Sequence, residues 1–249
     1  MSQDHAGNHP SAGRELPPPS AFAGDDGSAD PALLSAVEAL LAGHGTTAQL
    51  VATLVSARVL IPVMAELEHS GAGAAGLTVD KQASAGVVAV RAPDGRTALP
   101  VFSSVAALAA WSPGARPVPA WGRVAAASAL QEGWELLVLD PAGAQVHVPR
   151  PALVAMAAGE SWMPAVEAGA VRPDVRQAIV RALTGADAVV RVDAVPGRRA
   201  EVAVVIALRP GLDQGGLERV TRDAGLRLAA DALVASAVDS VELRVVPGG

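Results

Sequence analysis

Cysteine is absent from this chain of 249 residues, which excludes disulfides and thiolate chemistry and leaves the redox compartment open. Aromatic residues make up only 2% of the chain and apolar residues 51%, so the core must be built from many small contacts. Lysine occurs once, at Lys81, and every other basic side chain is arginine. Because the length exceeds the common domain size of about 100 to 150 residues, we expect two domains.

Clustered positive charge is also missing. The formal net charge is −6, and no basic run is longer than Arg198-Arg199. Since nucleic-acid binding depends on Lys and Arg that neutralise phosphates, this balance disfavours nucleic acid. No apolar run approaches the roughly 20 residues that cross a bilayer, and the first residues lack the pattern of a secretory signal. We therefore expect a cytoplasmic protein that binds neither nucleic acid nor membrane.

The composition and the pattern of apolar residues change three times along the chain. Residues 1–29 are rich in Gly, Pro, Ser and Asp and predict a disordered tail, because they cannot bury enough apolar surface. Residues 30–158 predict one α+β domain, residues 159–173 a linker, and residues 174–249 a domain of order α-β-β-α-β. The expected fold class is α+β: two small mixed α/β domains, each a small sheet with helices packed on it.

Local signals place the main elements. Asp30-Pro31 is an N-cap followed by proline at the first helical position, which predicts that a helix begins there. Asp94-Gly95 lies between two β-rich runs and predicts a hairpin. The proline-rich residues 113–119 are expected to form a loop. In the second domain, we expect helices over residues 174–183 and 213–230 and strands over residues 188–192, 200–208 and 241–246.

A series of motifs in the first domain follows the order found in one known family. The motifs are Ala57 to Val63, Asp80-Lys81, Ala92 to Ser104, Trp111, Arg116 to Pro119, Leu137 to Gly143, Arg150 to Leu153, Trp162 and Pro164. Over roughly residues 30–165 the chain therefore resembles the N-terminal domain of the SseB family, in its actinobacterial form. The resemblance implies a fold and a family, but no reaction, because the family has no established catalytic residues to carry over.

One glycine pattern suggests nucleotide binding. Gly71, Gly73 and Gly76 form a literal G-x-G-x-x-G after an expected strand. The dinucleotide fingerprint requires a helix to open at these glycines, so that its N-terminus faces the pyrophosphate. Residues 77–80, Leu-Thr-Val-Asp, follow instead and show no helical pattern. A flexible loop is therefore favoured.

Other catalytic and metal patterns are equally weak. Only His5 and His9 have the spacing of a helical metal site, and they lie in the expected tail. Glu66 and Glu68 share one face if their strand continues, which could pair two carboxylates, although a solvated strand end is favoured. We therefore expect no enzyme activity, no metal site and no cofactor.

Tryptophans gather in or next to the first domain. Trp134 and Phe102 are interpreted as core residues. Trp111 and Trp121 flank the proline-rich loop, where they could anchor a protein partner, as Trp does at interface hot spots, or pack in the core. Both interpretations stay open for this pair.

The remaining polar candidates are Lys81, Asp94, Arg96 and Arg116, which come from loop ends and turns where recognition residues concentrate. Lys81 could bind a carboxylate or a phosphate as a point charge. It could equally form a structural ion pair with Asp80 or Asp94. The sequence leaves both roles open.

Two hypotheses of function follow. The first is an SseB-like, non-enzymatic protein-protein interaction module that binds an unidentified protein partner through the first domain, at Trp111 and Trp121. The alternative is a small-ligand regulator of metabolism that senses an amino acid and holds its carboxylate with Lys81 and Arg116. The oligomeric state stays open.

Overall fold

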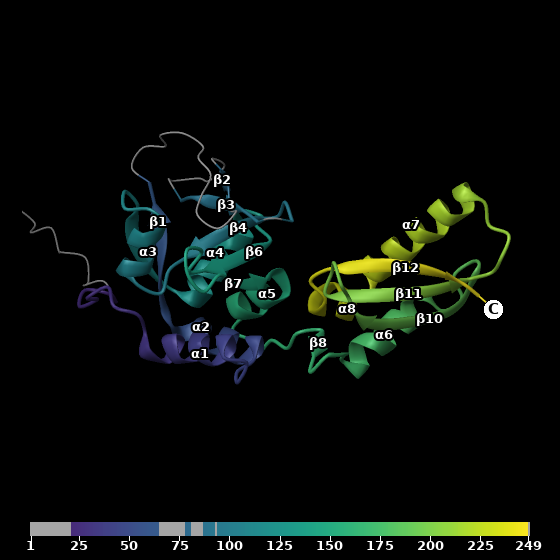
Figure 1. Ribbon diagram of the computed structural model, residues 1–249, viewed down its shortest axis with the longest axis horizontal. Helices are drawn as coiled ribbons and strands as arrows, with labels where there is room; N and C mark the ends of the chain where they lie inside the picture. Colours follow the sequence, from purple (N-terminus) through teal and green to yellow (C-terminus); the bar gives the residue numbers. More distant parts are fainter. Residues whose placement is uncertain (1–20, 65–77, 81–86, 93, 249) are drawn as a thin grey trace, which may run out of the picture.

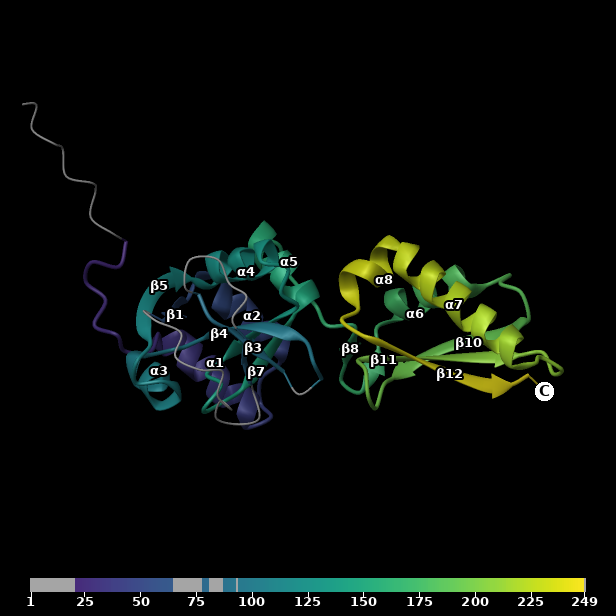
Figure 2. The ribbon, with the colours of Figure 1, turned by 90° about the horizontal axis from the view of Figure 1, so that it is seen from above.

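The computed structural model describes residues 21–64, 78–80, 87–92 and 94–248. Helices and strands are mixed along the chain, which confirms the α+β class. We call residues 21–158 the N-terminal region and residues 164–248 the C-terminal region. The two lie side by side in Figures 1 and 2, and their division into two independent domains stays a prediction.

Strands of the N-terminal region form two ladders. The described strands are β1 (Arg58–Val63), β2 (Thr78–Asp80), β3 (Ala89–Arg91), β4 (Thr97–Val101), β5 (Arg116–Trp121), β6 (Leu136–Leu139) and β7 (Val146–Pro149). Five of them make a sheet of order β2-β3-β4-β6-β7, with only β4 and β6 parallel, while β1 pairs antiparallel with β5. Leu60 and Phe102 exchange both backbone hydrogen bonds, at 2.8 and 2.9 Å, and so connect β1 to the end of β4.

Helices of this region begin where the sequence provides caps. They are α1 (Pro31–Leu41), α2 (Thr47–Ser56), α3 (Val105–Trp111), α4 (Gly122–Gln131) and α5 (Arg150–Ala158). The Asp30 side chain accepts hydrogen bonds from the amides of Ala32 and Leu33, which confirms the predicted start of α1. Thr46 and Gln49 form a capping box at α2.

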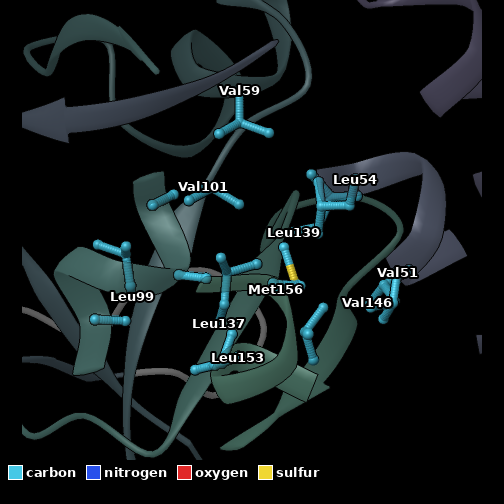
Figure 3. Packing of buried hydrophobic residues seen from close by; sticks show 14 of the residues in the cluster. Val51, Leu54, Val59, Leu99, Val101, Leu137, Leu139, Val146, Leu153 and Met156 are labelled. Atoms are coloured by element: carbon cyan, nitrogen blue, oxygen red, sulfur yellow. The ribbon is translucent and has the colours of Figure 1, made fainter. Parts of the chain in front are cut away.

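The main core lies between these helices and the sheet (Figure 3). Leu54 of α2 and Met156 of α5 pack with Leu137 and Leu139 of β6 and with Val59 of β1. On the opposite face, α3 covers a smaller cluster that includes the fully buried Phe102. Burying each of these large side chains against the sheet stabilises the fold by about 1.5 to 3 kcal/mol.

The C-terminal region is a three-stranded sheet of order β10-β11-β12 covered on one face (Figure 2). β10 and β11 are antiparallel, and β11 and β12 are parallel. The cluster between sheet and helices consists mainly of valine and alanine. The elements are β8 (Val166–Glu167), β9 (Ala170–Val171), α6 (Pro173–Leu183), β10 (Val189–Pro196), β11 (Val202–Leu208), α7 (Gln214–Ala230), α8 (Ala232–Ala237) and β12 (Val241–Pro247).

The predicted loop over residues 113–119 is wrong, because residues 116–121 form β5. Val118 lies opposite Ile61 of β1, so the segment is held in a ladder despite its prolines. The prolines are tolerated because β5 is an edge strand, where an amide that faces solvent is not needed by the ladder.

Three further segments differ from their sequence predictions. Residues 21–29 of the expected tail pack on β1 and β5: the Phe22 ring lies 4.9 Å from that of Trp121, and Asp25 pairs with Arg58 at 3.0 Å. The expected linker contains the short β8–β9 hairpin. Helix α8 was not predicted from the sequence. Asp231 both ends α7 and caps α8, so no loop residues separate the two helices.

Candidate functional site

The residues singled out by sequence reasoning do not gather at one place. Lys81 lies outside the described residues, as do the glycine motif, Glu66 and Glu68. No described contact joins Arg96, Arg116 and Asp140, the last of which belongs to the family motif Leu137 to Gly143. Asp140 instead accepts hydrogen bonds from the amide and the hydroxyl of Ser103, at 2.8 and 2.7 Å, and holds the end of β4.

Arg96 links the two regions. Its Nε lies 2.8 Å from Oδ2 of Asp94, and one terminal nitrogen lies 2.9 and 2.8 Å from the two carboxylate oxygens of Asp239. The Asp239 side chain is only 13% exposed. Burial alone would raise the pKa of Asp94, but hydrogen bonds from the Arg96 amide and side chain outweigh it and lower this pKa. Burial opposes the charge of Arg96 in the same way, yet its two carboxylate partners raise its pKa.

A pocket of about 260 Å³ opens beside this ion pair, at the junction of the two regions. We call it the junction pocket, and its walls include Arg96, His147, Trp162, Glu201 and Asp239. The indole Nε1 of Trp162 is buried and has no hydrogen-bond partner among the described residues. The pocket therefore lies beside two carboxylates and a tryptophan whose buried ring nitrogen is unpaired among the described residues.

Sequence reasoning missed the junction pocket, because its residues come from distant segments. Glu201 accepts hydrogen bonds from the amides of Ala165 and Asp239, at 2.9 and 2.8 Å, and so holds the chain that leaves the N-terminal region. Trp162 and Pro164 carried a signal as family motifs, and Arg96 as a polar candidate near a turn. No local sequence pattern distinguishes Glu201 or Asp239 from other acidic residues.

A second surface lies on β5. It consists of Arg116 and Val118 on one face of the strand and of Pro117 and Trp121 on the other, the side on which Trp111 lies, and we call it the β5 surface. Arg116 is exposed and makes no ion pair with any described residue. Val118 is 45% exposed, which is high for an apolar strand residue. One face of β5 therefore offers an exposed valine beside a cation that has no ion-pair partner among the described residues.

Both tryptophans of this surface are half-buried. The Trp111 ring packs on Phe102 at a centroid distance of 5.3 Å, and Trp121 packs on Phe22. Each ring is thus fixed on one side by another aromatic ring while the residue stays partly accessible. Each tryptophan is therefore packed against the protein on one side, as a core residue is, and accessible on another, as an anchor for a partner must be.

The free edge of β5 offers few hydrogen-bond donors. The Gly122 amide donates to the Ala57 carbonyl at 2.9 Å, so every second residue before it, Val118 included, also faces β1. Pro117 and Pro119 therefore face the free edge, and proline has no amide hydrogen. Main-chain pairing with another strand is blocked at both positions.

The described residues provide little for other kinds of site. No group of three or more His, Asp or Glu side chains among them could hold a metal ion. In the same part of the chain, no helix combines the length and the apolar character needed to cross a membrane.

Comparison with known proteins gives one match. Neither the curated proteins nor the solved structures contain a match to this chain. The family model of the SseB protein N-terminal domain matches residues 33–155, which run from within α1 to within α5 and include all the described strands between them. These residues confirm the resemblance carried by the motifs, and the chain belongs to the SseB family through its N-terminal domain.

Proposed function

We propose that this SseB family member is a non-catalytic, cytoplasmic protein that binds another protein through the β5 surface. The observation that carries the proposal is the combination of exposed Val118 and Arg116, unpaired among the described residues, on a strand that ends at one anchored tryptophan and follows a helix that ends at another. Interfaces are enriched in Trp and Arg, and rings that are already fixed lose little entropy on binding.

The partner is held by side chains and not by strand addition. Pro117 and Pro119 remove the amide donors that an added strand would need, so main-chain pairing contributes little. Arg116 favours an acidic segment of the partner, and Val118 on the same face of β5 favours an apolar one. An acidic peptide segment with an apolar or aromatic residue fits both requirements.

Surface variants test this proposal without disturbing the core. Val118→Glu and Arg116→Glu should each abolish capture of a partner from cell lysate by the immobilised chain. Val124→Glu is the matched control, because Val124 of α4 is 46% exposed and lies outside the β5 surface. A partner retained equally by all three variants, or a loss of capture in the control as well, would contradict the proposal.

The junction pocket favours a second candidate function, binding of an amino acid. The charges of Glu201 and Asp239 suit an ammonium group, and the unpaired indole nitrogen of Trp162 would suit a carboxylate once the ring turns toward the pocket. Thermal unfolding with free amino acids tests this candidate, since a ligand at 100 times its Kd stabilises by about 2.7 kcal/mol. A shift that vanishes in Trp162→Phe supports it, whereas no shift, or an equal shift in that variant, would rule it out.

A further inference from the structure

One side of β12 has no partner strand among the described residues. The Val202 amide donates to the Ser240 carbonyl at 3.1 Å, and the Gly248 amide donates to the Leu208 carbonyl at 2.7 Å. Because residues alternate along a strand, the even-numbered residues of β12 face β11. The amides and carbonyls of Val241, Leu243 and Val245 therefore face the open edge.

The other described edges are protected against pairing. β2 and β7 are only three and four residues long. β10 has a register irregularity between Val189 and Arg191, and β5 carries its two prolines. β12 has seven residues, shows no irregularity in its register, and has its proline only at the last position. An edge of this kind is a template for another strand.

The sequence of β12 is complementary to its own reverse. Residues 241–245 read Val-Glu-Leu-Arg-Val. When two copies run antiparallel with Leu243 opposite Leu243, each Val241 meets the partner's Val245. Each Glu242 then meets the partner's Arg244. Apolar residues meet apolar residues and opposite charges meet across the strands, which is the pairing that stabilises antiparallel sheets.

We propose that the chain forms a two-fold symmetric homodimer through antiparallel pairing of β12 with β12 of a second copy, centred on Leu243. In this register Leu243 and the Val241–Val245 pairs occupy the hydrogen-bonded positions, because their amides face the edge. Glu242 and Arg244 occupy the closer, non-hydrogen-bonded positions, where side-chain contacts are strongest. The two sheets of order β10-β11-β12 become one continuous sheet.

An apolar pocket beside the same edge fits this arrangement. It measures about 320 Å³, and its walls include Leu228 of α7, Val234 of α8, Val238 directly after α8, and Leu243. Leu243 also packs against the cluster under the helices, so the odd-numbered side chains of β12 lie on the helix side. A strand added to β12 places its own valines and leucine on that side, where they cover the pocket.

The exposed apolar residues near the edge become covered in the dimer. Val241 and Val245 are 37% and 41% exposed, and Leu226 of α7 is 67% exposed. Leu226 follows Gly225, which lines the pocket. Burial of these side chains adds a hydrophobic contribution to the main-chain hydrogen bonds of the paired edges.

Charge variants give a decisive test by sedimentation equilibrium of the full chain. The wild type should have twice the chain mass of 24.9 kDa. Glu242→Arg brings arginine opposite arginine, and Arg244→Glu brings glutamate opposite glutamate, so each variant alone should be monomeric. A mixture of the two should form a heterodimer, because every cross-strand pair is then opposite in charge. The double variant that exchanges the two residues should dimerise by itself.

A main-chain variant keeps the proposal testable if a charge change disturbs folding, which circular dichroism detects. Leu243→Pro removes an amide that faces the edge and leaves the β11–β12 ladder intact, so it should yield a folded monomer. Leu243→Val is the matched control and should remain dimeric. A wild type that is monomeric up to its solubility limit overturns the proposal. So does a dimer that persists in Leu243→Pro and in both single charge variants.

Discussion

The edge strands β5 and β12 differ in whether their open edges can pair with another strand. β5 lies in the N-terminal region and presents prolines at the positions that face its open edge, whereas β12 in the C-terminal region presents amides. The first can bind a partner only through side chains, and the second can extend its sheet. One chain can therefore carry two kinds of interaction surface that do not compete.

The two cores differ as well. Most of the large, fully buried side chains lie between Leu33 and Met156, and they include Phe102 and ten leucines. The C-terminal core is built mainly from valine and alanine. Because buried area sets the hydrophobic contribution, we expect the N-terminal region to resist unfolding more strongly.

Phe102→Ala should have the largest effect. Removing a fully buried phenylalanine costs about 3 to 5 kcal/mol, since both the transfer energy and a cavity are involved. All four tryptophans lie at or before Trp162, so fluorescence in urea reports the N-terminal region and its junction. If the two regions unfold as separate domains, the fluorescence transition shifts to lower urea while part of the circular dichroism transition does not.

The matched control for the C-terminal core is Ile206→Val, which should cost only about 0.5 to 1.5 kcal/mol. It should shift the circular dichroism transition and leave the fluorescence transition in place. Coincident shifts of both signals in both variants would contradict the two-domain prediction.

Gly197→Ala should have the next largest effect. A Cβ at Gly197 would lie 2.0 Å from the Ala200 carbonyl oxygen, inside the turn that joins β10 to β11. The turn must open to admit it, at a cost of about 1 to 3 kcal/mol. Urea unfolding followed by circular dichroism measures the loss. Gly225→Ala, where the added Cβ meets no atom, is the control and should not destabilise.

Replacing both β5 prolines by valine should convert this edge into one like β12. Pro117→Val with Pro119→Val restores two amides on the open edge, so we expect new self-association that light scattering detects. The expected change in the free energy of unfolding is small, within about 1 kcal/mol. The control is Pro113→Val. Pro113 lies before β5, so this variant should not self-associate. Absence of association in the double variant would show that the prolines do not protect this edge.

The smallest expected effect is that of pH on Glu242. The hydrogen bond from the Arg198 amide is the main cause that lowers its pKa to about 2, and Arg244 and Arg199 lower it further. A lowered pKa in the folded state stabilises above the ordinary value of 4.5, and this stabilisation is lost as the pH falls toward about 2. Glu242→Gln should therefore flatten the acid dependence of unfolding between these pH values. An unchanged acid profile would contradict this assignment.

The elements that were predicted correctly have local causes. The cap at Asp30 and the Asp94-Gly95 turn each act within a few residues, and Gly95 has the φ of +88° that such a turn needs. β5 was missed because its stability comes from pairing with β1, some 60 residues away, while its prolines locally favour a loop. The contact between Arg96 and Asp239 spans 143 residues, and no local pattern could have predicted it.

The prolines of β5 also limit how large an assembly can grow. Two-fold pairing through β12 uses the same edge on both copies, so it closes after two chains. A second receptive edge on each copy would let pairs join end to end into an open filament. Pro117 and Pro119 prevent the edge of β5 from pairing with another strand, so assembly through strand pairing stops at the dimer.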